Sequence, residues 1–207
     1  MPRSKVRLLL AAAAVATVIA SQPLVATATH LTNDKWRIYT FSGRTNAVFF
    51  HFEPGWPTTS HQFRVRDGAT KWNNALSNLY FVYDQADGAN VSAVWTDVKP
   101  PFMDNAIAYA TYEGCPNLLC LGSINFDKFA NWYYLTGTPG ANQYDLTTAA
   151  THEWGHEVSL RHETSSSAYI MWATLPLGAK KRCPVSHEIT NVRTMYGTVG
   201  SALSCTN

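Results

Sequence analysis

Charged residues are scarce in this chain, and its basic residues form no cluster with interleaved aromatic side chains. Only 14% of the 207 residues are Asp, Glu, Lys or Arg, and the formal net charge is +2. Proteins that bind nucleic acid gather Lys and Arg into patches with interleaved aromatic side chains, and no such patch occurs in this sequence. Apolar residues make up 46% of the chain, so the composition argues against disorder and supports a sizeable core.

Beyond its N-terminal segment, the sequence has no apolar run long enough to cross a membrane. The N-terminal segment has three basic residues within its first seven, Arg3, Lys5 and Arg7, continues with an apolar run over residues 8–20 and ends in Ala26-Thr27-Ala28. This order is typical of a secretory signal peptide with an A-x-A cleavage pattern. We predict that residues 1–28 are removed and that residues 29–207 form one secreted domain without membrane attachment. An uncleaved anchor is disfavoured because the run is short for a bilayer.

Cysteine is also rare. The chain has four cysteines and no Cys-x-x-Cys pair, which disfavours a zinc site built from cysteines. In an exported protein an even number of cysteines predicts disulfides, and four cysteines allow three pairings. We favour Cys115–Cys120 with Cys183–Cys205, because the first two are close in sequence and the other two flank the C-terminal segment.

Apolar residues at helical spacing predict three helices. The first covers residues 60–78 with Ser60 as its N-cap, and the second begins after Asp145 as N-cap. The third covers residues 185–196 and ends before Gly197. In the second helix the residues expected to face the core are Leu146, Ala150, Trp154 and Val158.

Short runs rich in aromatic and β-branched residues predict strands before and after the first helix. The expected strands cover residues 36–41, 47–52, 80–83, 92–98, 106–112 and 121–126. The order of strands, helix, strands and two helices indicates an α+β fold with a sheet backed by helices. One connection contains Asp84, Asp87 and Asn90, where an ordinary polar turn is favoured over a Ca²⁺ site because the EF-hand pattern is absent.

Two histidines and a glutamate lie within the second predicted helix. His152 and His156 are four residues apart, so both imidazoles lie on one helix face and can bind one metal ion. A catalytic zinc ion takes three protein ligands and leaves its fourth position to water, so a third ligand is required. His162 is the candidate, provided that the helix ends near residues 158–160 and the chain turns back.

Glu153 directly follows the first candidate ligand. Its carboxylate can take a proton from a water molecule and pass it to the departing amine, so the pattern predicts a zinc-dependent hydrolase with Glu153 as general base. One alternative is a surface helix with two solvated histidines. Another is a secreted binding module with a structural zinc ion, which Glu153 disfavours because a structural site needs no base and usually closes its fourth position.

The arrangement His152-Glu153-x-x-His156-x-x-Ser159-x-x-His162, followed by Met171, resembles the extended zinc signature and Met-turn of the metzincin clan. Within that clan the chain looks like a bacterial matrixin-type peptidase. The resemblance implies a zincin-like catalytic domain with a twisted five-stranded mixed sheet and three main helices. It also implies a zinc ion bound by the three histidines, a catalytic glutamate, and a hydrophobic floor formed by the methionine.

The chain departs from the clan pattern at two positions. Ser159 replaces the glycine of the turn, and a serine with left-handed backbone costs about 1–2 kcal/mol. Either this strain is tolerated, or the turn differs and His162 is less well placed. Ala173 stands where some clan members carry a tyrosine that serves as an extra ligand, so no fourth protein ligand is expected there.

The implied fold also locates the substrate. An extended peptide would pair with an edge strand above the cleft, and residues 106–112 are the candidate strand. The pocket for the side chain after the scissile bond would lie between the zinc-binding helix and residues 172–175. We expect substrate contacts from Ala108, Tyr109, Thr148, Ala149, Trp172 and Ala173. The leading hypothesis is a secreted, monomeric zinc endopeptidase acting on peptides or proteins, with a hydrolase of cell-wall peptides as a further alternative.

Overall fold

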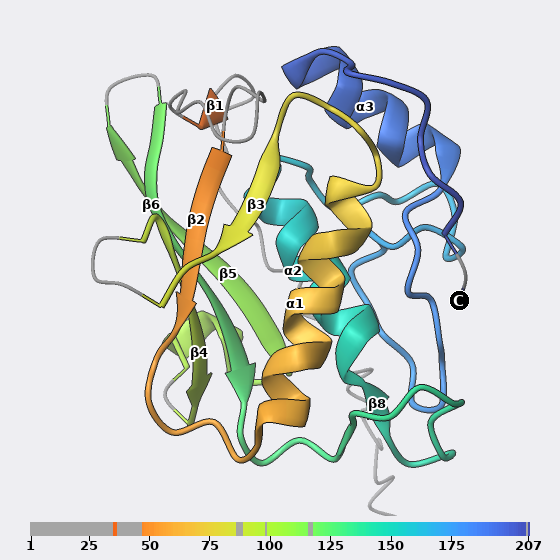
Figure 1. Cartoon of the computed structure of the whole chain (residues 1–207). Coiled ribbons are helices and arrows are strands. Elements are labelled where there is room, and N and C mark those ends of the chain that lie inside the picture. Colours follow the sequence, from red (N-terminus) through yellow and green to blue (C-terminus); the bar gives the residue numbers. More distant parts are fainter. Residues whose placement is uncertain (1–34, 37–46, 86–88, 98, 116–117, 206) are drawn as a thin grey trace, which may run out of the picture.

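The computed structural model describes residues 35–36, 47–85, 89–97, 99–115, 118–205 and 207. The predicted signal peptide lies outside this part of the chain, as do residues 37–41 of the first predicted strand. The side chains of Cys115 and Cys120 are likewise outside the described set, so their predicted pairing stays a prediction. The predicted α+β class is confirmed, and Figure 1 shows a sheet with helices packed against one side of it.

Five long strands make up the sheet, in the order β3 (Tyr80–Tyr83), β2 (Ala47–Phe52), β4 (Val91–Thr96), β6 (Leu118–Asp127) and β5 (Ala108–Cys115). The two-residue strand β1 (Lys35–Trp36) also pairs with β6. All pairings in this sheet are parallel except that of β5, which runs antiparallel to β6 at the edge. The predicted five-stranded mixed sheet is therefore confirmed, with β1 as a short addition.

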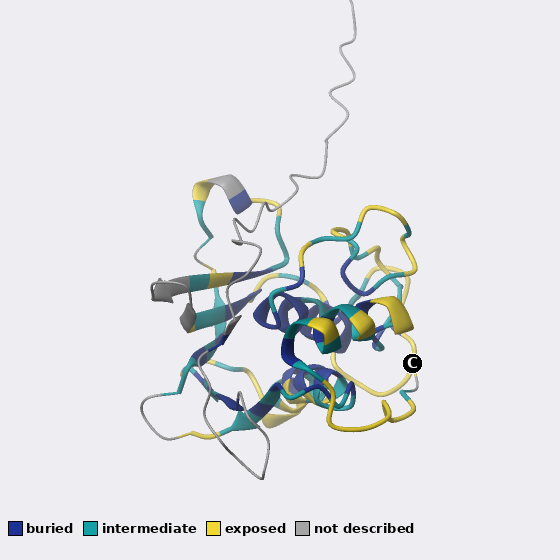
Figure 2. Ribbon diagram, turned by 90° about the horizontal axis from the view of Figure 1, so that it is seen from above, coloured by how far each residue is buried: buried dark blue, intermediate teal, exposed yellow. Residues whose placement is uncertain are grey.

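Two helices cover one face of the sheet, α1 (Thr59–Asn73) and α2 (Leu146–Glu157) (Figure 1). Their contact is fixed by two tryptophans, since Trp72 Nε1 donates to Thr151 O at 2.7 Å and Trp154 Nε1 donates to Val65 O at 2.9 Å. Both indoles are fully buried, and the buried residues gather between the sheet and this helix pair (Figure 2). The core therefore holds α2, which carries the histidine motif, in a fixed position under the sheet.

Helix α1 differs from its prediction at both ends. Its N-cap is Thr58, whose side chain accepts from His61 N, so the predicted cap Ser60 lies inside the first turn. The helix ends at Asn73 rather than at residue 78, and Leu76 has a left-handed backbone with φ of 52°. The predicted helix was too long because Leu79 fits the helical spacing of apolar residues, although it is buried from a position beyond the helix.

Several short elements were not predicted. These are the 3-10 turn η1 (Pro101–Met103) and the strands β7 (Trp132–Tyr133) and β8 (Tyr144–Asp145), which pair in parallel. Strand β8 runs directly into α2, so it sets where the helix begins.

The C-terminal part of the chain consists of loops and helix α3 (Ser186–Tyr196), which ends at Gly197 as predicted. A disulfide joins Cys183 to Cys205, as the sequence predicted. None of the helices in the described part of the chain combines the length and apolar character needed to span a membrane.

Candidate metal centre

Helix α2 begins at the predicted cap. The side chain of Asp145 accepts a hydrogen bond from Thr148 N at 2.7 Å, which satisfies one of the free amides of the first turn. The four residues expected to face the core, Leu146, Ala150, Trp154 and Val158, are all fully buried. The opposite face of the same helix is thus left to carry the histidines toward a cleft.

The structure brings His152, His156 and His162 together. Their three Nε2 atoms form a triangle with sides of 3.1 Å. Three nitrogens that bind one zinc ion at about 2.1 Å in tetrahedral geometry lie about 3.4 Å apart. The observed spacing therefore fits the base of a zinc tetrahedron.

The far side of two of these rings is held by backbone carbonyls. His152 Nδ1 lies 2.8 Å from Ile170 O, and His156 Nδ1 lies 2.8 Å from Leu160 O. A carbonyl can only accept, so each Nδ1 carries the proton and each Nε2 presents a lone pair to the centre. Burial, with the neighbouring His162 adding to it, lowers the pKa of His152 to about 4. The neutral imidazole that a metal ion needs is thereby favoured.

Ser159 makes the turn that returns the chain to the metal site. Its φ is 65°, in the left-handed region, so the serine takes the conformation for which the clan uses glycine. Leu160 N donates to Gly155 O at 3.0 Å and Ser159 N donates to His156 O at 2.7 Å, which is the hydrogen-bond pattern of a Schellman motif. Of the two outcomes considered for this residue, the turn is retained and the strain is tolerated.

Met171 is fully buried directly under the histidine helix. A Cβ atom added to Gly155 would lie 2.2 Å from Met171 Sδ, so only glycine allows this approach. The methionine backbone is fixed from α3, because Met171 N donates to a carboxyl oxygen of Glu188 at 2.8 Å. Met171 thus packs against the helix that carries the histidines, and its role as a hydrophobic floor beneath the metal stays a prediction.

Two carboxyl groups of α2 are buried one helical turn apart. Burial raises the pKa of Glu153 to about 8, and Oε2 of this residue meets no hydrogen-bond partner among the described residues. Burial and the Glu153 carboxylate also raise the pKa of Glu157. Glu153 lines the cleft beside the histidines, whereas Glu157 is turned into the core. The protonation of Glu153 therefore depends on a positive charge near it, as a metal ion would supply.

A cleft of about 440 Å³ lies over the three histidines and Glu153. One wall is the edge strand β5, as predicted for the strand that would receive a peptide, and the other wall follows Met171. All six residues that the sequence suggested for substrate contact line this cleft: Ala108, Tyr109, Thr148, Ala149, Trp172 and Ala173.

A family model for matrixin matches residues 39–197. The chain belongs to the matrixin family. No curated protein gives a significant match to it. Matrixins are zinc metallopeptidases, and the three-histidine group of this member has the donor chemistry for zinc. Peptides or proteins are accordingly the substrate class that the family implies.

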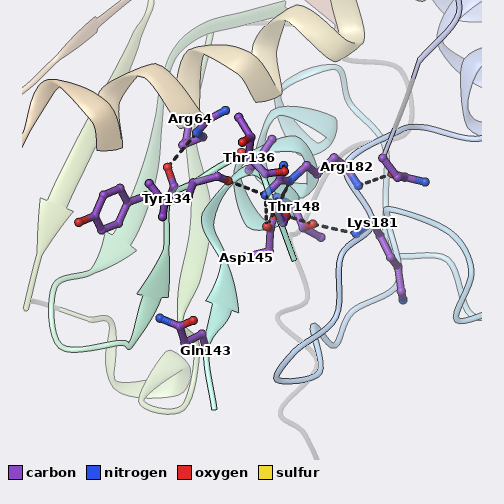
Figure 3. Close-up of polar contacts among 12 residues, drawn as sticks. Arg64, Tyr134, Thr136, Gln143, Asp145, Thr148, Lys181 and Arg182 are labelled. Atoms are coloured by element: carbon purple, nitrogen blue, oxygen red, sulfur yellow. Dashed lines mark hydrogen bonds and ion pairs between the residues drawn. The ribbon is translucent and has the colours of Figure 1, made fainter. Parts of the chain in front are cut away.

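A buried ion pair that no sequence pattern indicates joins Arg182 to Asp145 near the cleft (Figure 3). Arg182 Nη2 lies 2.5 Å from Asp145 Oδ2, and the same guanidinium donates to the carbonyls of Leu135 and Thr136 at 2.8 Å. The two partners are 37 residues apart in sequence, and no local pattern marks either as paired. The ion pair joins the N-cap of α2 to Arg182, whose neighbour Lys181 lines the cleft.

Calcium receives no support from the described residues. Asn90 Oδ1 accepts from Phe49 N at 3.0 Å, which is the role of a turn residue, and Asp87 lies outside the described part of the chain.

Proposed function

We propose that this matrixin is a secreted zinc endopeptidase in which His152, His156 and His162 bind zinc and Glu153 is the general base. The observation that carries the proposal is the triangle of Nε2 atoms with 3.1 Å sides, beside a buried carboxylate, at the floor of an open cleft. When bound there, a zinc ion would act as a Lewis acid on a water molecule and on the scissile carbonyl.

Glu153 carries the proton transfers. Its side chain points into the cleft next to the histidines, and its Oε2 atom has no hydrogen-bond partner among the described residues. As a carboxylate it takes a proton from the attacking water, and as an acid it then gives that proton to the departing amine. Burial favours the protonated form of Glu153 and a neighbouring metal ion would favour the carboxylate, so both forms would be accessible to it.

The peptide is held by strand β5. Among the strands of the described residues, β5 pairs only with β6 and lies at the sheet edge, where an extended substrate strand could be added by backbone hydrogen bonds. The side chain after the scissile bond would enter the part of the cleft between Thr148 and Ala149 on one side and residues 172–175 on the other. Secretion is supported by the N-terminal segment of the sequence and is compatible with the Cys183–Cys205 disulfide.

The competing function is a binding module with a structural zinc ion. The open cleft above the histidines and the position of Glu153 favour the enzyme, because a structural site needs neither.

The test is casein hydrolysis by the mature protein, with and without chelator, together with the zinc content of each sample. We expect about one zinc ion per chain, loss of hydrolysis on chelation, and a loss of about 10²–10⁴-fold in Glu153→Ala without loss of zinc. Glu53→Ala is the matched control, because Glu53 does not line the cleft. A protein that binds zinc but hydrolyses no peptide, or a fully active Glu153→Ala variant, would refute the enzyme proposal.

A further inference from the structure

Lys181 lines the cleft, and among the described lining residues it is the one lysine or arginine. Its backbone N–H donates to Thr148 Oγ1 at 2.9 Å, which attaches it to the first turn of α2. Its neighbour Arg182 is locked by Asp145 and by the carbonyls of Leu135 and Thr136. The backbone of residues 181–182 is therefore held firmly against the helix that carries the histidines, as Figure 3 shows.

The side chain of Lys181 extends away from that polar network (Figure 3). Its ammonium donates to the carbonyl oxygen of Ser167, and no carboxylate among the described residues forms an ion pair with it. An ammonium group has three donors, so two remain for another acceptor. Burial lowers the pKa of Lys181, whereas the nearby charge of Glu188 raises it.

The charges that line the cleft are unbalanced. Glu153 is the sole carboxylate among the described lining residues, and it faces the histidines. Even with Glu188, whose charge acts on Lys181, counted beside Glu153, a bound zinc dication and Lys181 would leave this part of the cleft positive, so it would attract an anionic group and repel a cationic one.

We propose that Lys181 is a specificity-determining residue that selects substrates with an acidic side chain directly after the scissile bond. This inference rests on the proposed function, because the pocket that receives this side chain is the one next to Thr148, to which Lys181 is bonded. Thr148 and Ala149 are small and line the same cleft as Lys181, which leaves space there for an acidic side chain. Asp or Glu would then form a charge-assisted hydrogen bond that Asn or Gln cannot match.

The experiment is cleavage of a peptide library by zinc-loaded mature protein, with wild type, Lys181→Met and Lys181→Glu compared. All peptides have amidated C-termini, so that a terminal carboxylate cannot stand in for the side chain. Lys180→Met is the matched control. It is the same substitution at the adjacent residue, and Lys180 is not among the residues that line the cleft. Zinc content and thermal melting establish that each variant is folded.

We expect wild type to prefer Asp or Glu over Asn or Gln after the scissile bond by about tenfold or more. Lys181→Met should lose this preference, Lys181→Glu should turn it toward Lys and Arg, and Lys180→Met should behave as wild type. Cleavage with no acidic preference in wild type, or the same preference in Lys181→Met, would overturn the assignment while leaving the peptidase intact. Absence of cleavage altogether would instead refute the proposed function.

A second measurement does not depend on turnover. Zinc-loaded Glu153→Ala should bind an uncleaved acidic peptide about tenfold more tightly than its amide analogue, and Lys181→Met in that background should abolish the difference. Equal binding of the two peptides by Glu153→Ala would also overturn the assignment.

Discussion

At its N-terminal end, helix α2 starts on Asp145, whose two carboxyl oxygens are both bonded to the Arg182 guanidinium. At its C-terminal end the same helix buries Glu157, whose carboxyl oxygens meet no donor among the described residues, and closes on Ser159 with φ of 65°. Thr148 and Lys181 line the cleft beside the first end, and the second end leads to His162. The contrast indicates that the N-terminal end of α2 is held by satisfied polar contacts, whereas the turn before His162 is held under strain.

The buried carboxyl group and the left-handed residue at the C-terminal end of α2 are accommodated by contacts with other elements. A Cβ atom at Gly122 of β6 would lie 2.7 Å from Glu157 Oε2, so this glycine gives the buried carboxyl group its room. Ser159 Oγ lies 3.2 Å from the hydroxyl of Tyr196 on α3, which helps to hold the left-handed residue. Strain at a functional turn persists only where surrounding structure enforces it.

Breaking the N-terminal end should have the largest effect. Arg182→Met leaves the fully buried Asp145 carboxylate without its cation, and we expect the free energy of unfolding to fall by about 3–5 kcal/mol in urea titrations. Arg64→Met is the matched control, because Arg64 makes a more exposed hydrogen bond to Tyr134 O in the same region and should cost about 1 kcal/mol (Figure 3). Equal losses of unfolding free energy in the two variants would show that the ion pair does not stabilise the N-terminal end of α2.

Replacing the buried carboxyl group of Glu157 should have an intermediate effect on the free energy of unfolding, and this effect should depend on pH. Because the pKa of Glu157 is raised in the folded state, its contribution to stability is present below the unfolded pKa and is lost as pH rises. Glu157→Gln removes this titration. The free energy of unfolding of the variant minus that of wild type should therefore increase by up to about 1.4 kcal/mol per pH unit above about pH 4.5. Urea titrations of both zinc-saturated proteins between about pH 5.5 and about pH 8 measure the difference. A difference that does not vary with pH would mean that Glu157 is solvated.

Much of the metal site could be predicted from local sequence. The four-residue spacing of His152 and His156, the cap at Asp145 and the apolar face of α2 are all set within one helix. The position of Met171 followed from the resemblance to the metzincins, and its contact with Gly155 was visible only in the structure.

The missed features depend on contacts between distant segments. Arg182 reaches back 37 residues to Asp145, and Glu157 is buried against Gly122 of a different strand. A glutamate near a helix end and a lysine-arginine pair in a loop look like solvated surface residues in the sequence. The early end of α1 was missed for the same reason, because the apolar spacing continued into a loop that is also buried.

Removing the strain at Ser159 should have the smallest effect, and two variants separate its two causes. S159G relieves the left-handed backbone and loses the hydroxyl contact with Tyr196, whereas S159A loses the contact and keeps the strain. S159G should therefore be more stable than S159A by about 1 kcal/mol in urea titrations, with unchanged zinc affinity because the hydrogen bonds of the turn come from the backbone. If S159A proves as stable as S159G, the surrounding contacts with α3 hold residue 159 without strain, and the contrast between the two ends of α2 rests on Glu157 alone.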